Sequence, residues 1–559
     1  MKKSLLLALF AVVLLLPFRS YAEQNLGSWL TIGGDYQARL DYLQGSTPTF
    51  YGFGGPAGSA GAQNGAFFDA FMTALPAFHL TFAQVQSLTP AQLQGLESQI
   101  TPATVAGLEA GGFITTAQGK ALLAGTKASA GEDFRNNSLL TNRFGLNFMA
   151  KPLESIHVKA RLVMYKAWGS DSANPVDQNM FFMDRAGTFD GVQGHVPGTD
   201  SVLVDYAYAT WSNIADQPVW FSVGRRPSTG GVPGNLRRNA VNIGTAGVPN
   251  LLIDYAFDGF SLGWAPYIEA LPGAYAKFCG GRGFDSGFSN LHDTNFAGLF
   301  VVPYNTDQLE ITLQWDRGID VFDAPPDFAV PTTATSGVQE FLNPTSNVGN
   351  IDWYGAVAQG MIKNVNYFAA GALSHAMPNG NRAGAFGPFI EQSLGYVDQN
   401  TGFPLAQSAL TPQQAANVKN LEPQMLDGQN HTGWAIYLGA RYDIDSTRTK
   451  LGAEFNHGSK DWIGFVPAGD DMWTSKLGTR GDVYELYAIQ EIHAKPIDKL
   501  AVAYFRLGWQ YYDIKYTGSN NWLGSPLAMS DLASSPLNAQ IFAPIKSAQD
   551  IYFTFNVNF

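Results

Sequence analysis

The sequence predicts an all-β fold, a transmembrane antiparallel β-barrel of about 16 strands with a long, partly helical loop insertion. Three observations support this prediction: the composition, a period-2 alternation of apolar and polar residues, and joins that alternate between short and long. Of 559 residues, 45% are apolar, 13% aromatic and only 14% charged, and 60 are Gly. These values favour a turn-rich β chain with an apolar outer surface over several soluble domains.

Residues 1–22 have the pattern of a cleaved signal peptide. Two lysines precede an apolar run from Leu5 to Leu16, and Ser20 and Ala22 supply small side chains at positions −3 and −1 for cleavage before Glu23. The run is shorter than the roughly 20 residues that span a bilayer, which argues against a retained anchor. We therefore expect residues 23–559 to form a single barrel. Cleavage removes Lys2, Lys3 and Arg19 and no acid, so the net charge of −12 becomes −15, which argues against a nucleic-acid partner.

Alternation of apolar and polar residues starts at Leu30 and predicts each strand in turn. The expected strands are 30–42, 140–150, 156–166, 201–211, 219–226, 251–257, 260–266, 295–303, 309–318, 351–362, 367–374, 434–443, 449–457, 483–494, 501–512 and 551–559. The expected tight turns are 151–155, 213–218, 258–259, 304–308, 363–366, 444–448 and 495–500. The other joins are much longer, as in outer-membrane barrels with short periplasmic turns and long external loops. An even strand count places both termini on the periplasmic side.

Aromatic residues support the same prediction. The last strand ends on Phe559, a terminal aromatic of the kind that the barrel-assembly machinery recognises. Other aromatic residues at strand ends are expected to form girdles at the two membrane interfaces. They are Tyr42, Trp168, Trp211, Tyr442, Trp509 and Tyr511.

The join 45–135 is exceptional in its length and its low charge. Thr residues, two of them followed by Pro, predict short helices starting near Thr89, Thr101 and Thr115. A loop with so few charges is not expected to be freely solvated. It either packs as a helical lid over the barrel mouth, which we favour, or folds into the lumen as a plug.

Polar faces of the strands supply candidate pore-lining charges. The basic candidates are Arg39, Arg143, Lys159, Arg161 and Arg226, and the acidic candidates are Glu310, Asp316, Glu454, Glu485 and Glu491. Two opposed arcs of this kind would set a transverse field that orients solutes and selects ions. The alternative is that these charges pair with their neighbours and hold the barrel in shape.

A second group of arginines follows the fifth expected strand. Arg225 and Arg226 end that strand, and Arg237 and Arg238 lie in the Gly- and Pro-rich segment 227–250. Guanidinium groups on a loop folded into the lumen would form an anion-selective constriction. On an external loop, the same side chains would bind lipopolysaccharide phosphates or nearby acids.

Signals for an enzyme, a metal site or a cofactor are weak. The eight histidines are scattered and none lies in a nucleophile motif. Cys279 is the only cysteine, so no haem-attachment motif exists. The loop acids Asp470 and Asp471 lack EF-hand spacing and are expected to be solvated. We expect a protein that is not an enzyme and has no resident metal or cofactor.

The Gly224-Arg225-Arg226 strand end, followed by an arginine-bearing loop, resembles outer-membrane porins, and the pattern from Leu30 to Phe559 is also similar to a barrel family of metal-reducing deltaproteobacteria. The resemblance implies an integral, multi-pass barrel of a Gram-negative outer membrane, in contact with lipid and lipopolysaccharide and in some cases homo-oligomeric. It implies passive diffusion of small hydrophilic or anionic solutes. The alternative is the barrel sheath of a porin–cytochrome electron conduit, for which multihaem cytochromes would have to be separate partners.

Overall fold

The computed structural model describes 14 main stretches of the chain. They are residues 24–25, 29–50, 100–125, 130–169, 200–229, 236–239, 251–285, 293–322, 347–379, 430–466, 469–492, 501–520, 526–534 and 544–559. The structure also describes the short pieces 74, 128, 197, 329–330, 340–341, 382–383, 387–388, 396–397, 404–405 and 522. The predicted signal peptide and most of 51–99 and 230–250 lie outside these residues.

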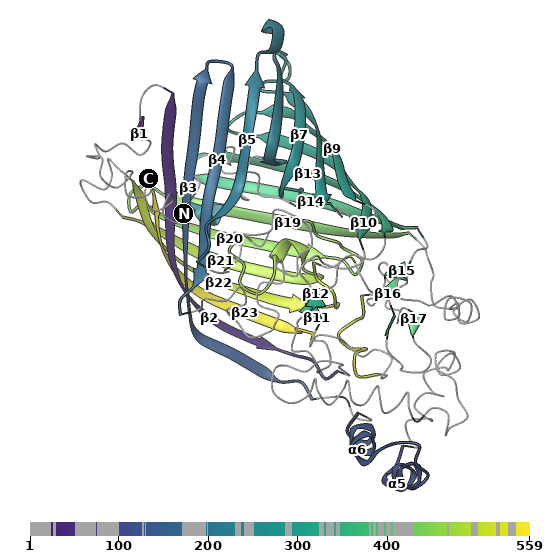
Figure 1. Cartoon of the computed structure of the whole chain (residues 1–559). Helices are drawn as coiled ribbons and strands as arrows, with labels where there is room; N and C mark the ends of the chain where they lie inside the picture. The colour runs from purple at the N-terminus through teal and green to yellow at the C-terminus, as the bar shows by residue number, and fades with distance from the viewer. Residues whose placement is uncertain are drawn as a thin grey trace, which may run out of the picture.

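One closed antiparallel barrel organises the described chain (Figure 1). Its first strand, β2 (Leu30–Ser46), pairs on one side with β3 (Asp133–Leu153) and on the other with the last strand, β23 (Ser547–Asn558). The seventeen-stranded sheet consists of sixteen barrel strands and the two-residue β1 (Gln24–Asn25), which extends β2. The other barrel strands are β4 (Ile156–Ala167), β5 (Leu203–Ser212), β6 (Val219–Pro227), β7 (Ala256–Trp264), β8 (Tyr275–Phe284), β9 (Thr294–Asn305), β10 (Glu310–Phe322), β13 (Asn347–Ile362), β14 (Val365–Pro378), β19 (His431–Ile444), β20 (Thr449–Gly458), β21 (Gly481–Glu491) and β22 (Val502–Ile514). The predicted barrel is confirmed.

The joins between barrel strands contain short strands and 3-10 helices. Three antiparallel pairs of two-residue strands lie outside the barrel sheet: β11 (Ala329–Val330) with β12 (Glu340–Phe341), β15 (Arg382–Ala383) with β16 (Gly387–Pro388), and β17 (Tyr396–Val397) with β18 (Pro404–Leu405). The described chain also has short 3-10 helices, η3 (Ile214–Asp216), η4 (Leu236–Arg238) and η10 (Lys476–Gly478). No helix in the described part is long and apolar enough to cross a membrane.

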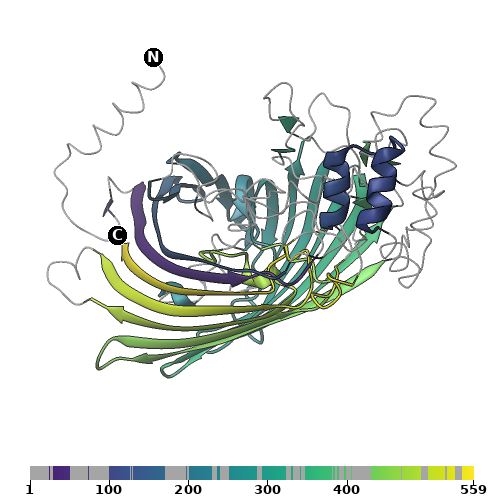
Figure 2. The same ribbon diagram turned by 90° about the horizontal axis from the view of Figure 1, so that it is seen from below.

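Two helices form where Thr starts were predicted. In α5 (Pro102–Ala110), the Thr101 side chain accepts a hydrogen bond from the Thr104 N–H and Pro102 takes the first helical position. The second helix, α6 (Thr116–Gly125), packs against α5. Both lie beyond the strand ends, at the opposite end of the molecule from the C-terminus (Figure 2). Whether the whole of 45–135 acts as a lid stays a prediction.

The sixth strand was predicted wrongly. Residues 251–255 are not part of the sheet, and the predicted turn at Asp258-Gly259 lies inside β7, paired with Arg282 and Gly281 of β8. The strand β8 was not predicted, because its Gly280, Gly281 and Gly283 break up the alternation. The join between β7 and β8 is residues 265–274. The false strand and the missed strand offset each other, so the predicted number of strands still agrees.

The outward faces of the strands are apolar through the middle of the barrel. Large side chains exposed there come from every part of the ring, among them Leu40, Val223, Leu262, Leu299, Leu313, Leu373, Leu438, Leu486, Leu507 and Phe553. Toward the long-loop end, acid–base pairs replace them on the same outer face. These pairs are Arg225–Asp258, Arg282–Asp293, Arg317–Asp352, His457–Asp482 and Lys515–Asp513. An apolar band with a charged border is the surface that a lipid-facing barrel requires.

The seam that closes the barrel depends on a close backbone approach. Gly34 and Phe559 exchange two backbone hydrogen bonds, of 2.7 and 2.9 Å. A Cβ on Gly34 would lie 2.5 Å from the carbonyl oxygen of Gly145 and 2.8 Å from the ring of Phe559. Backbone on one side and the terminal ring on the other leave no space for a side chain.

We therefore expect Gly34→Ala to destabilise the barrel by about 1–3 kcal/mol through overpacking. The measurement is the urea unfolding midpoint of the refolded protein. Gly371→Ala is the matched control, because a Cβ there would meet only the Ala435 carbonyl oxygen, at 4.0 Å. Equal midpoints for the two variants would contradict the assigned seam.

Candidate functional site

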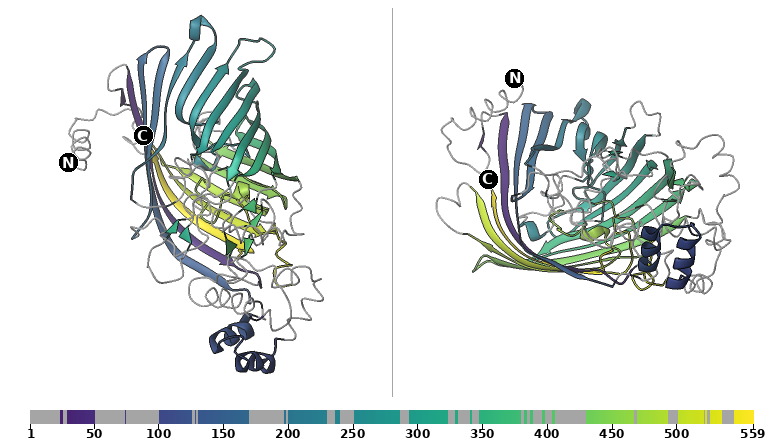
Figure 3. Two further views of the ribbon diagram at one scale, coloured as in Figure 1. Left: turned by 45° about the vertical axis from the view of Figure 1, so that its right-hand side comes forward. Right: turned by 60° about the horizontal axis from the view of Figure 1, so that its bottom comes forward.

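The join between β20 and β21, residues 459–480, folds inward and is called the inner loop here. It lies within the ring of strands in both views of Figure 3. Its side chains Trp462 and Trp473 are fully buried. The Trp462 indole N–H donates to the Leu477 carbonyl at 2.8 Å, and that of Trp473 donates to the Gln549 carbonyl of β23 at 3.0 Å. The inner loop is therefore folded on itself and fixed to the wall.

The join between β6 and β7, residues 228–255, is called the arginine loop. Its described central part, 236–239, is held through main-chain carbonyls by the inward side chains of the distant strands β19 and β22. Arg441 donates to the Leu236 carbonyl at 2.7 Å, and Arg506 donates to the Arg237 carbonyl at 2.8 Å. Tyr504 binds the next carbonyl, that of Arg238, at 2.9 Å. This part of the loop thus lies inside the barrel, against strands far from β6.

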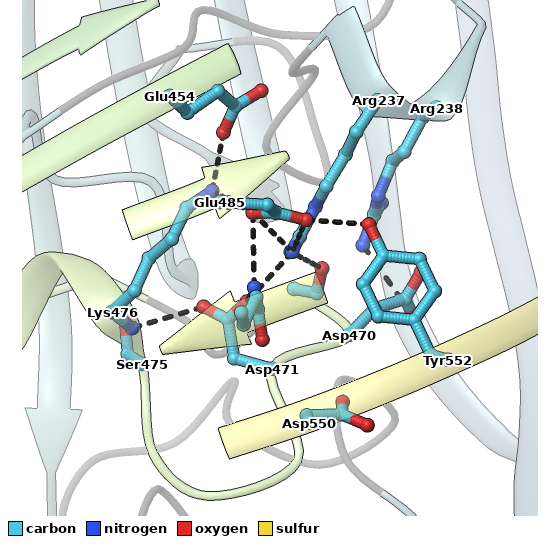
Figure 4. A network of polar contacts seen from close by, with 12 residues as sticks. Arg237, Arg238, Glu454, Asp470, Asp471, Ser475, Lys476, Glu485, Asp550 and Tyr552 are labelled. Carbon is cyan, nitrogen blue, oxygen red and sulfur yellow. Dashed lines mark hydrogen bonds and ion pairs between the residues drawn. The ribbon is translucent and has the colours of Figure 1, made fainter. Parts of the chain in front are cut away.

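The two loops meet at Arg237, whose side chain is almost fully buried (Figure 4). It donates to Asp471 of the inner loop at 2.8 Å, to the Gly469 carbonyl at 2.6 Å and to Glu485 of β21 at 3.1 Å. One guanidinium group therefore joins the arginine loop, the inner loop and the barrel wall.

Glu485 is the centre of this part of the network. Besides Arg237, its carboxylate accepts from Lys476 at 2.5 Å, from the Tyr552 hydroxyl at 2.6 Å and from Gln510 at 3.0 Å. Lys476 also forms an ion pair with Glu454 of β20. We call Arg237, Lys476, Glu454, Asp471 and Glu485 the Glu485 cluster. All five side chains are buried, so the two cations and three carboxylates are held by one another and not by bulk water.

Asp470 is the centre of a second cluster, in which arginines outnumber acids. Its side chain accepts from Arg143 at 2.6 Å and lies 3.6 Å from Arg506 and 3.8 Å from Arg238. Its main-chain carbonyl accepts from Arg39 at 2.9 Å. We call Asp470 and these four arginines the Asp470 cluster. Residues from β2, β3, β22 and the arginine loop thus converge on one inner-loop residue.

Burial and charge act in opposite directions on the loop groups of this cluster. Burial raises the pKa of Asp470, but the guanidinium groups of Arg143, Arg238 and Arg506 lower it more, so the pKa lies well below its usual value. For Arg238, burial is the largest effect and lowers the pKa to about 10, because the attraction of Asp470 is offset by Arg143, Arg237 and Arg506. Asp470 is therefore held ionised, whereas Arg238 has too little negative charge around it.

The opposite part of the interior is apolar. Phe465 of the inner loop packs on Tyr255 of the arginine loop, with ring centroids 4.6 Å apart, and on Trp353 of β13 at 5.2 Å. Phe257 and Phe296 extend the same stack from β7 and β9. Residues 251–253, predicted as part of a strand, belong to this core. Ile253 forms backbone hydrogen bonds with the Gln314 side chain of β10 instead of a sheet pairing.

The predicted pore-lining residues lie in three different environments. Six of them belong to the Glu485 cluster or the Asp470 cluster: Arg39, Arg143, Arg237, Arg238, Glu454 and Glu485. Arg161 pairs with Asp35 at 2.7 Å, and Glu491 pairs with Lys450 at 2.7 Å. The remaining four lie outside the clusters and these ion pairs. Glu310 accepts a hydrogen bond from Gln359 at 2.9 Å, and Arg226 donates one to the Cys279 sulfur at 3.6 Å. Asp316 is buried on β10, whereas Lys159 is exposed.

Arg225 is on the other side of the wall. It alternates with the exposed Phe221 and Val223 and pairs with Asp258 at 4.0 Å on the outer face. The acids Glu454 and Glu485 do not face an open path toward a basic arc, because the inner loop covers them.

Sequence reasoning missed the inner loop. Asp470 and Asp471 were expected to be solvated, which is wrong: Asp470 is buried among arginines, and Asp471 is buried against Arg237 and Gln510. Trp462, Phe465 and Trp473 in one loop were the available signal, since three such side chains are not expected in water. Among the described residues, no group of three or more His, Cys, Asp or Glu is arranged to hold a metal ion.

We expect Glu485→Gln to cost about 3–5 kcal/mol, because it removes the buried carboxylate that accepts from Arg237, Lys476 and the Tyr552 hydroxyl together. The measurement is the unfolding free energy of the refolded barrel. Glu491→Gln on the same strand is the control and is expected to cost less than about 1 kcal/mol, since the Glu491 side chain is 22% exposed and its pair with Lys450 is open to solvent screening. Similar losses in the two variants would contradict the central place of Glu485.

The Asp470 cluster also predicts a pH dependence. The pKa of Asp470 is lower in the folded chain than its unfolded value of about 3.9. Its ion pairs therefore stabilise the inner loop above about pH 3.9, and this contribution is lost as pH falls through the lower folded pKa. Tryptophan emission during acid titration, with Trp473→Phe as the reference for the loop, should stay constant from pH 7 to 5. A transition of the Trp473 signal within that range would exclude this assignment.

No curated protein matches the chain. Among solved structures, OmpT of Vibrio cholerae, folded in vitro and in its trimer form, is 9% identical, with 95% of this chain and 100% of that chain covered and a TM-score of 0.36. OmpF of Salmonella typhi in complex with daunomycin is 7% identical (94% and 97% covered, TM-score 0.38). An anion-selective porin from Comamonas acidovorans is 9% identical (95% and 99% covered, TM-score 0.37). The family model described as "Protein of unknown function (DUF3373)" matches residues 133–559, from β3 to the last residue, and the chain belongs to that family.

Proposed function

We propose that this protein is an outer-membrane channel through which small hydrophilic solutes, preferentially anions, diffuse passively along a path narrowed by the inner loop and the arginine loop. The observation that carries the proposal is the contrast between the two faces of the barrel. The outer face is an apolar band, whereas one half of the interior is built from paired and unpaired charges. Such an interior is costly unless the lumen is used by water and polar solutes.

The preference for anions follows from the distribution of charge in the Asp470 cluster. Four guanidinium groups surround one inner-loop carboxylate, and two of them, on Arg143 and Arg238, remain slightly exposed. Arg226 lies on the same interior surface farther along the ring. Fixed positive charge at a narrow point lowers the barrier for anions and raises it for cations.

The outer membrane is the location that we propose for this barrel. The Arg–Asp pairs on the outer face at the long-loop end suit the phosphates of lipopolysaccharide, and Phe559 in the closing seam suits recognition by the barrel-assembly machinery. No observation favours the alternative of a cytochrome sheath, since residues 462–466 and 469–480 lie where an inserted partner would run.

Planar-bilayer recording of the protein purified alone tests the proposal. We expect discrete conductance steps with a permeability ratio that favours chloride over potassium. Arg226→Ala combined with Arg238→Ala should reduce that ratio, because it removes interior positive charge. The matched control is Arg225→Ala, which removes the neighbouring arginine from the outer face and should leave the ratio unchanged.

Two results would oppose the proposal. A folded barrel that never conducts would exclude the channel, and co-purified haem without conductance would favour the conduit instead. Equal effects of the Arg225 and Arg226/Arg238 substitutions would exclude an interior origin of the selectivity.

A further inference from the structure

The arginines around Asp470 have more hydrogen-bond donors than the surrounding acceptors use. Arg506 is fully buried, yet its Nε and Nη2 make no hydrogen bond within the described residues. The same holds for Nε and Nη2 of Arg238 and for Nε of Arg143. Buried guanidinium donors without acceptors are costly, so this arrangement indicates a place for a further acceptor.

Negative charge is also short at this point. The only ionic partner that the described residues give Arg506 and Arg238 is Asp470, at 3.6 and 3.8 Å, which is longer than a hydrogen bond. The other nearby acids are engaged by other arginines: Asp41 and Asp550 both bind Arg39, and Asp35 binds Arg161 at 2.7 Å and lies 3.5 Å from Arg143. The lowered pKa of Arg238 has the same cause, burial that the nearby negative charge does not compensate.

We propose that Arg143, Arg238 and Arg506 form a binding site for a small oxyanion, a carboxylate or a phosphate, and that Asp470 occupies this site as an internal substitute in the present state. Three guanidinium groups from β3, β22 and the arginine loop present forked donors that match the oxygens of such anions. Asp470 uses only part of them, since its one short side-chain contact to an arginine is to Arg143.

Competition for the site couples binding to the position of the inner loop. An entering oxyanion that takes the arginines removes the ion pairs that hold Asp470, and through it residues 469–476, against the wall. By linkage, whatever loosens the inner loop increases the affinity of the site for the anion to the same extent. The part this plays in transport rests on the proposed channel function, whereas the binding site does not.

Calorimetric titration with inorganic phosphate, and separately with acetate, tests the site in the purified barrel. We expect Asp470→Asn to bind phosphate at least about tenfold more tightly than the wild type, because the internal competitor is gone. Asp513→Asn is the control, since it removes a carboxylate from the outer face and should leave the affinity unchanged. Adding Arg238→Gln or Arg506→Gln to Asp470→Asn should abolish the gain, whereas adding Arg282→Gln on the outer face should not.

A measurement on the wild type covers the case in which Asp470→Asn does not fold. Phosphate should increase hydrogen exchange of the amides at 470–478, and chloride at equal ionic strength should not. Unchanged exchange, or an Asp470→Asn affinity equal to that of the wild type, would overturn the proposal. Tight phosphate binding by a barrel that never conducts would uphold the site and exclude the channel, and conductance without phosphate binding would do the reverse. Acetate and phosphate arms that differ would identify which oxyanion the site prefers.

Discussion

The interior of this barrel depends on the burial of one loop carboxylate among arginines. Asp470 is held by side chains from β2 and β3 at one side of the closing seam, from β22 at the other, and from the arginine loop. Since these contacts come from segments spread along the chain from Arg39 to Arg506, they are what brings the inner loop, the arginine loop and the wall into one arrangement. Arg237 and Glu485 extend the same principle, because Arg237 of one loop and Lys476 of the other both reach Glu485 only when both loops are in place.

The barrel itself could be predicted because the outer face imposes a simple rule. Every second residue of a lipid-facing strand must be apolar whatever fills the interior, so alternation locates β2, β19 or β22 from local sequence alone. The prediction of strands from alternation fails where the apolar residues of a segment do not lie on the outer face. In β8, glycines replace two of the polar residues expected on the inner face and one of the apolar residues expected on the outer face, so the alternation is recognisable only from Tyr275 to Cys279. Residues 251–257 alternate well, but their first half is apolar because it packs inside the barrel.

The interior network could be predicted only in part, for a related reason. Alternation shows that Glu485 and Arg39 point inward, but it does not show what they meet. Their partners, Asp471, Lys476 and Asp470, come from a loop, and loops carry no periodic signal of their position. The predicted basic and acidic arcs therefore do not face each other across a lumen. Their side chains pair with residues of the inner loop instead. Exposing Trp462, Phe465 and Trp473 of one loop to water would be unfavourable. An apolar, aromatic composition of this kind is the best available sign that a loop folds inward.

The two halves of the lumen hold the inner loop by different physics, and this difference bears on function. Phe465 is fixed by ring stacking and apolar burial, which dissolved ions do not compete for. Asp470 and Asp471 are fixed by charge, and a buried ion pair contributes little net stability once desolvation is counted. Water or an oxyanion reaching the Asp470 cluster therefore weakens the ionic attachment while leaving the apolar one intact. If an oxyanion binds there as proposed, the inner loop loses its attachment at Asp470 while Phe465 stays stacked, so the solutes that fit the guanidinium groups are also those able to release that part of the loop.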